Sequence, residues 1–217
     1  EDSRTLRARD IHTRAASQPE AEQLALTPFE AYGSDVTNNT GYAAYLRITL
    51  LPKVQGKFRP TYARARVTTA VANQYISSCI YRFDPRESTI NHKGDSISRG
   101  GIFYKVPGSD ARFSTSSTGV KTVQLTGYGK QGDEPVLNPN SIYFLGAFVS
   151  HTGIGVVGDA NTSSRMFPVN ILSVDKSTPI ATTGTLLNRV NQRDLEPSFA
   201  RAIPWIVYLS RAASEVV

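Results

Sequence analysis

The residues of this chain that could take part in chemistry are few and widely spaced. The three histidines, His12, His92 and His151, lie far apart, and none stands at a spacing typical of metal ligands. Ser150 precedes His151, but adjacent side chains in a strand or loop normally diverge. The G-x-S-x-G pattern of a hydrolase nucleophile is absent. These residues therefore predict neither a metal site nor a nucleophile with its base.

Acidic side chains are the next candidates, because a glycosidase needs two carboxylates facing each other across a groove. Four of them lie in predicted turns close to glycine or proline: Asp84, Glu87, Asp133 and Glu134. Acidic residues in such places commonly hydrogen-bond the backbone of the turn itself. We therefore predict no catalytic residue, no cofactor and no metal ion, and a protein that is not an enzyme.

Gly153, Gly155 and Gly158 match the G-x-G-x-x-G pattern of dinucleotide-binding turns. This pattern binds phosphate where it opens a helix within a strand–helix–strand unit. The surrounding sequence predicts no such unit, so we interpret the glycines as residues of a flexible loop.

Length and composition indicate one soluble domain. A chain of 217 residues can bury a sizeable core. Its single cysteine, Cys79, excludes an internal disulfide and lies in an apolar run, which predicts a buried structural thiol. No segment indicates a membrane span or a signal peptide, so we expect synthesis in a reducing compartment. Because the sequence begins at Glu1 without methionine, we expect a start residue or a longer leader before it.

The net charge of +6 is distributed unevenly. Residues 47–130 hold 14 Lys or Arg against 4 Asp or Glu, a balance of +10. Such a field attracts nucleic acid, an acidic protein or a charged polysaccharide, or it is simply a solvated face. The sequence shows neither a nucleic-acid reader motif nor basic residues interleaved with aromatic ones, so we expect the solvated face.

Alternation of side chains predicts the central strands. In residues 62–70, Ala63, Ala65, Val67 and Thr69 alternate with polar residues, so Arg64 and Arg66 should point outward. Residues 75–83 are apolar on both faces, with Cys79 and Tyr81 opposing Ile76 and Ile80, as in a strand near the middle of a fold. Residues 71–74 are short enough to join the two strands as a hairpin.

Other apolar runs predict further strands at 45–51, 102–106, 120–125, 142–149, 166–174 and 203–209. In the last run Ile203, Trp205, Val207 and Leu209 share one face. Residues 84–118, 126–140 and 151–164 are rich in turn residues and predict long loops, and one helical turn is expected at 186–190. Many strands without intervening helices predict an all-β fold, an antiparallel β-sandwich of jelly-roll type.

The amino-terminal residues predict a separate attachment element. Residues 1–16 are polar and show no clean period, which indicates an extended arm. Ser17 and Glu20 form a capping box, which predicts a short helix over 18–26. We therefore divide the chain into an arm and short helix, residues 1–37, and a β-sandwich domain, residues 38–217.

Four segments in order resemble a β-sandwich module of bacteriophage tail-fibre, spike and other virion-associated proteins. They are Ala63–Thr69, Ser77–Tyr81, Ser117–Val123 and Leu137–Leu145, and the resemblance covers residues 40–150. The chain departs from the pattern at Phe144, where tryptophan is usual, and in its long loops. The motifs are short and hydrophobic and imply a shared fold, but no functional residue.

The resemblance implies a structural virion protein, a tail, fibre or appendage component that mediates assembly or attachment to the host surface. Its expected partners are other virion proteins, copies of itself in a homo-oligomer such as a trimer, and a host glycan or receptor, without membrane insertion. Two alternatives stay open. One is a jelly-roll capsid protein of a small virus, whose basic region would face nucleic acid; the other is a carbohydrate-binding module.

Overall fold

The computed structural model describes ten stretches of the chain. They are residues 24–26, 34–37, 46–54, 56–85, 101–126, 132–159, 171–174, 186–192, 195–197 and 203–210. Within them the regular structure is β-strand, and every strand pairing is antiparallel. The all-β class predicted from the sequence is therefore confirmed. These stretches contain no helix long and apolar enough to span a bilayer.

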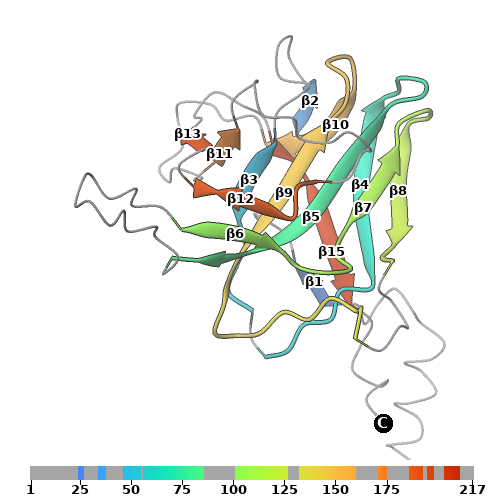
Figure 1. The fold of residues 1–217 in the computed structure, drawn as a ribbon. Coiled ribbons are helices and arrows are strands. Elements are labelled where there is room, and N and C mark those ends of the chain that lie inside the picture. The colour runs from blue at the N-terminus through green and yellow to red at the C-terminus, as the bar shows by residue number, and fades with distance from the viewer. Residues whose placement is uncertain are drawn as a thin grey trace, which may run out of the picture.

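The strands form two sheets (Figure 1). Sheet A has the order β1-β15-β4-β10-β14, with β2 paired to β10 and β8 paired to β4. Its strands are β1 (Leu24–Leu26), β2 (Ser34–Thr37), β4 (Tyr62–Thr69), β8 (Gly119–Gln124), β10 (Gly155–Asp159), β14 (Ile203–Pro204) and β15 (Ile206–Ser210).

Sheet B has the order β12-β6-β5-β9-β3-β11-β13, and β7 pairs with β5 beside β6. Its strands are β3 (Arg47–Leu50), β5 (Tyr75–Asp84), β6 (Ile102–Lys105), β7 (Ala111–Ser114), β9 (Ile142–Val149), β11 (Ile171–Val174), β12 (Arg189–Asn191) and β13 (Leu195–Pro197). The predicted central strand at 142–149 is β9, which pairs with β5 over its whole length.

One hydrophobic cluster draws residues from both sheets, so the sheets pack on a shared core. Sheet A contributes Ala63, Ala65 and Val67, which are buried, while Arg66 between them is exposed. The predicted alternation is confirmed over these residues, but Thr69 at the end of β4 is exposed. Small alanine side chains on β4 let the larger side chains of sheet B approach closely.

Strand β5 is buried on both faces, as its sequence predicts. Ile76 and Ile80 lie in the shared core. Cys79 and Tyr81 point to the opposite side, into a second cluster that includes Leu186 and Val190. Sheet B is therefore covered on one side by sheet A and on the other by the segment that leads into β12.

The predicted hairpin at residues 71–74 is wrong, because β4 lies in sheet A and β5 in sheet B. The connection crosses between the sheets, and Asn73 within it has a positive φ of 58°. The backbone N–H of Val71 donates to the Thr115 carbonyl at 2.9 Å, in the next connection that crosses between the sheets. A strand that is apolar on both faces must have both faces buried by other parts of the chain. A hairpin partner in the same sheet pairs along the edge of the strand and does not bury its faces.

Three further expectations are corrected by backbone pairing. Residues 24–26, expected in a helix, form β1 against β15. Residues 189 and 190, expected in a helical turn over 186–190, belong to β12, which pairs with β6. The predicted loops at 84–118 and 151–164 contain β7 and β10. Such short segments gain little from local helix hydrogen bonds, so pairing with a neighbouring strand decides their structure.

The division at residue 37 separates strands of one sheet. β1 and β2 both precede it, yet they pair with β15 and β10 of the predicted sandwich domain. The rest of the predicted arm and short helix, residues 1–23 and 27–33, lies outside the described residues, as do the predicted strand residues 166–170. The described residues ahead of position 38 therefore belong to sheet A.

A buried polar contact links the two sheets. The Tyr208 hydroxyl of β15 lies 2.9 Å from Ser78 Oγ of β5 and donates to the Ser109 carbonyl at 3.0 Å. Ser109 Oγ in turn donates to the Val106 carbonyl at 2.7 Å and accepts from the Ile80 N–H at 3.0 Å. The two serines and Tyr208 are all within 1% of full burial, so each hydrogen bond is made in the absence of water.

Tyr208→Phe is predicted to lower the free energy of unfolding by about 1–3 kcal/mol, because the Ser109 carbonyl loses its donor and Ser78 loses a partner in the core. Tyr143→Phe is the matched control, since its hydroxyl accepts from the Asn138 N–H beside the surface, where water can replace it. Urea unfolding of both variants measures the difference. Equal losses would contradict the assigned role of Tyr208.

Candidate functional site

The candidate nucleophile and base have separate structural partners. Ser150 Oγ donates to Gln74 Oε1 at 2.8 Å and accepts the Tyr75 N–H at 2.9 Å, so it fastens the start of β5. His151 Nδ1 accepts the Gly153 N–H at 2.9 Å within a turn. His12 and His92 lie outside the described residues. The arrangement orders the turn before β10 and does not bring the imidazole to the Ser150 hydroxyl.

The candidate carboxylates of the described residues have different surroundings. Glu134 forms an ion pair with Arg59, while Asp133 beside it is exposed. Asp84 ends β5 and is half-buried, and Glu87 lies outside the described residues. Within the described ranges, no group of three or more His, Cys, Asp or Glu side chains is placed to hold a metal ion.

The glycine pattern at 153–158 lies on β10 and the turn before it. Gly155 sits where the register between β10 and β4 shifts, and a Cβ there would come within 2.6 Å of the Thr68 and Thr69 hydroxyls. Close approach of two strands therefore explains this glycine. The interpretation of Gly155 as a flexible loop residue is wrong.

One thiol and two phenol side chains are buried in the protein interior. Burial raises the pKa of the Cys79 thiol, and it also raises the pKa of the Tyr81 and Tyr208 hydroxyls well above their usual range. Tyr81 donates to the Leu187 carbonyl at 2.8 Å, and Cys79 packs in the second cluster. A thiol whose thiolate form is suppressed is a poor nucleophile, which agrees with the predicted structural role of Cys79.

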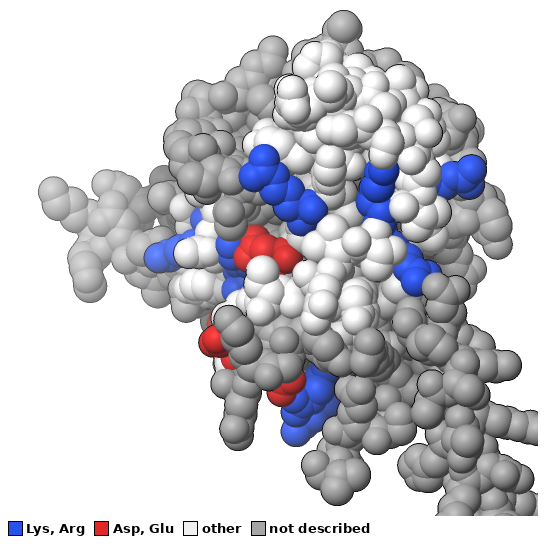
Figure 2. All heavy atoms as spheres, turned by 90° about the vertical axis from the view of Figure 1, so that its right-hand side faces the viewer, with Lys and Arg blue, Asp and Glu red and all other residues white. Residues whose placement is uncertain are grey.

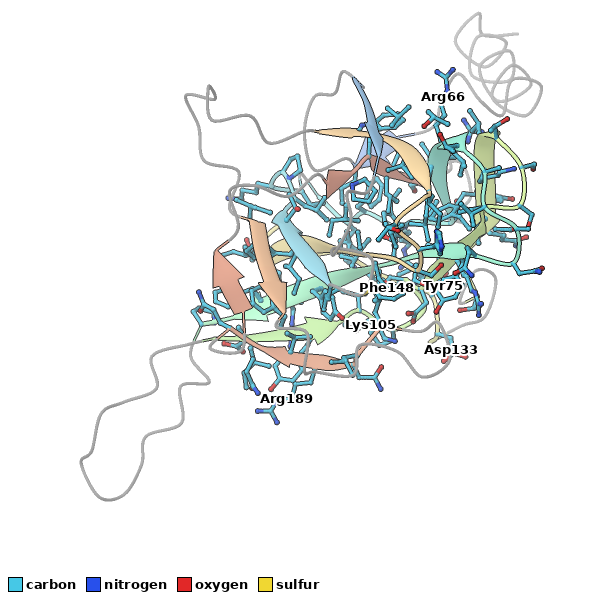
Figure 3. The ribbon with its side chains drawn as sticks, turned by 90° about the horizontal axis from the view of Figure 1, so that it is seen from above. Arg66, Tyr75, Lys105, Asp133, Phe148 and Arg189 are labelled. Atoms are coloured by element: carbon cyan, nitrogen blue, oxygen red, sulfur yellow. The ribbon has the colours of Figure 1, made fainter. Side chains whose placement is uncertain are left out.

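The basic side chains are spread over the molecule. In Figure 2 the Lys and Arg side chains of one face stand apart on a largely uncharged surface, with acidic side chains among them. Figure 3 places Arg66 and Arg189 at opposite ends of the molecule. Lys105 is bonded to Asp110 at 3.0 Å. The positive balance of residues 47–130 therefore does not gather into one patch among the described residues.

Arginine and tyrosine side chains nevertheless form a row across one end of sheet B, the Arg–Tyr row. Tyr104 of β6 lies directly opposite Arg189 of β12 on one side and Arg82 of β5 on the other. The two guanidinium carbons lie 5.9 Å and 6.0 Å from the Tyr104 ring centroid. Both arginines are exposed, so the row presents paired positive groups around an aromatic ring.

A second arginine–aromatic contact lies on the other face of sheet B. The Arg112 guanidinium lies 3.9 Å from the Tyr75 ring centroid, and Tyr75 lies 6.0 Å from Phe148 (Figure 3). Neither cluster is visible in the sequence alone, because its members come from different strands and their proximity depends on the register of distant pairs. The one local signal is Arg82, the single basic residue of the mainly buried β5.

The comparisons with known proteins leave the sequence resemblance without support. No protein-family model matches the chain, and no curated protein matches it.

Cys79 is predicted to resist a thiol-specific reagent in the folded protein and to react fully in denaturant, because burial suppresses the thiolate. The measurement is the absorbance released by a chromogenic disulfide at pH 8 with and without urea. Rapid reaction of the native protein, at the rate of a small free thiol, would contradict the structural role.

The buried hydroxyls and thiol also predict a pH dependence. Their ordinary pKa values are 9.0 for the thiol and 10.0 for the phenols, and folding raises all three. The unfolded chain therefore releases protons that the folded chain holds, so stability is unaffected at low pH and falls as pH rises above about 9. Urea unfolding from pH 7 to pH 11 measures this loss. In Cys79→Ala the onset should move toward the phenol range.

Proposed function

We propose that this chain is a structural protein of a bacteriophage particle, a tail, fibre or appendage component that serves assembly or attachment to the host surface. The proposed fold for this role is a β-sandwich of jelly-roll type. In this proposal the protein is not an enzyme, and it is located in the virion.

One observation carries the proposal. The four segments that resemble virion-associated modules coincide in order with four strands or their approaches: β4, β5, β8 and β9. These strands alternate between sheets A, B, A and B, and the alternation continues to β10 in sheet A. A jelly roll is wound by such crossings between two sheets. The motifs thus fall where packing requires them, as the resemblance implies.

Surface features of the described residues are consistent with a contact function. The outward-facing Arg82 and Arg189 are donors for carboxylate, phosphate or sugar hydroxyl groups, and β8 leaves one strand edge unpaired among the described residues. Proteins that assemble by symmetry use such edges and faces repeatedly. These features support binding without identifying the ligand.

A coat-protein role is the second candidate, and the Arg–Tyr row favours it. Positive groups interleaved with an aromatic ring suit single-stranded nucleic acid, in which phosphates meet arginines and bases stack on rings. The row contains two arginines, and Asp84 lies on the same strand face two residues from Arg82. This modest local charge ranks the coat-protein role below the appendage role.

Electron microscopy of the native particle tests the proposal. The expected result is density for this chain in a tail, fibre or other appendage, present in a small symmetric number of copies. Density in the shell instead would support the coat-protein role. Absence of the chain from purified particles, checked by mass spectrometry, would overturn both.

Nucleic-acid binding separates the two roles in solution. An appendage protein is expected to show weak binding of labelled single strands that does not depend on the Arg–Tyr row. A coat protein that uses the row would lose affinity steeply between about 50 mM and 200 mM salt. Arg82→Gln with Arg189→Gln would then weaken binding, whereas the matched control Arg66→Gln, at the opposite end of the molecule, would not.

A further inference from the structure

Strand β8 is the most open edge that the structure describes. It pairs with β4 on one side, and Figure 1 shows it at the right-hand margin of the molecule, with no described strand beyond it. Alternate residues of an antiparallel strand direct their N–H and C=O groups to the same side. About half of the peptide groups of β8 therefore point away from β4 toward the free edge.

The other described edge strands carry the protections that natural sheets use. β1, β2, β7, β12, β13 and β14 have two to four residues each, and β13 and β14 end in proline. β8 has six residues, no proline, and an uninterrupted register with β4 from Gly119 to Gln124. A long, regular edge of this kind is a template for another strand.

The side chains of β8 leave this edge accessible. Val120 is 63% exposed, which is the highest value among the large hydrophobic residues of the described chain. Lys121 is the residue that would guard the edge, but its ammonium is bonded to Ser117 Oγ at 2.6 Å and to the Thr118 carbonyl at 3.4 Å. The charge is thus directed back along the preceding turn.

We propose that β8 pairs antiparallel with β8 of a second copy of this chain, which joins two A sheets into one continuous sheet about a twofold axis. This dimer rests on the proposed role in particle assembly and specifies its contact, strand β8, and its partner, a second copy of the chain. Its geometry comes from β8 alone.

Symmetry and charge select the register of this pair. A twofold axis normal to the sheet places residues of the same face opposite each other, so it passes midway between the two copies of one residue, which is then said to be on the axis. With Thr122 on the axis, Val120 meets Gln124 of the second copy and Lys121 meets Val123. With Lys121 on the axis, two like charges oppose each other, which is unfavourable. Both registers pair five residues, so repulsion between the two copies of Lys121 favours the register with Thr122 on the axis.

Cysteine cross-linking of the full chain tests the register. Thr122→Cys should form a disulfide-linked dimer under mild oxidation, because residues opposite each other in antiparallel strands have Cα atoms about 4.5–5.5 Å apart, within disulfide range. Gln124→Cys is the matched control on the same strand and should cross-link little, because each Gln124 lies opposite Val120 of the second copy in this register. Cys79 is buried and gives no background.

Sedimentation equilibrium of the native chain provides the second measurement. The native chain should dimerise with rising concentration, and Thr122→Lys, which places two like charges on the axis, should weaken the dimer roughly fivefold or more. Thr122→Val keeps a β-branched pair and should preserve it. Thermal melts check that the variants fold, as expected for an exposed position.

A native chain that stays monomeric, or a Gln124→Cys variant that cross-links as readily as Thr122→Cys, would overturn the proposal. These measurements use the isolated chain, so they are independent of the particle microscopy. If the β8 dimer forms but the chain is absent from the virion, only the proposed function is contradicted. If the chain is in the virion but forms no β8 dimer, only this inference is contradicted.

Discussion

The need to cover both faces of β5 governs the arrangement of this protein. Ile76 and Ile80 on one face and Cys79 and Tyr81 on the other are all fully buried. Sheet A covers the first face through the shared core, and Leu186 and Val190 cover the second. Each buried aliphatic or aromatic side chain contributes about 1.5–3 kcal/mol. A two-layer structure with one wet side on sheet B would leave Cys79, Tyr81 and Phe103 in water.

Two glycines make this double cover possible. A Cβ on Gly146 of β9 would lie 2.5 Å from the Tyr81 ring, and a Cβ on Gly101 would lie 2.4 Å from the Phe83 ring. The aromatic rings of β5 therefore approach neighbouring glycine backbone closely, and Phe83, Phe103 and Phe144 pack with ring centroids 4.8–5.8 Å apart. The rings fill the space that side chains on those glycines would take. On the opposite face of sheet B, Tyr208 ties sheet A to sheet B through Ser78 and Ser109.

Local periodicity predicted the strands well where one strand's own residues decide burial. The alternation of Ala63, Ala65 and Val67 and the two apolar faces of β5 are of this kind. Sheet membership was not predictable, since β4 and β5 are adjacent in sequence but lie in different sheets. In the last strand, Val207 and Leu209 share a face, yet Ile206 and Tyr208 enter the shared core. Trp205 separates β14 from β15, and an interruption of this kind is not visible in the sequence pattern.

The same division applies to the surfaces proposed for function. Excluding Ser150 with His151 as a catalytic pair needed only their adjacency, and the structure gives each a different partner. The Arg–Tyr row needed the register of two strand pairs that join residues 82, 104 and 189. The open edge needed the knowledge that β8 pairs with β4 on one side and with no described strand on the other. Surfaces built by non-local pairing carry no spacing signal in the sequence, whereas chemistry that resides in a short motif does.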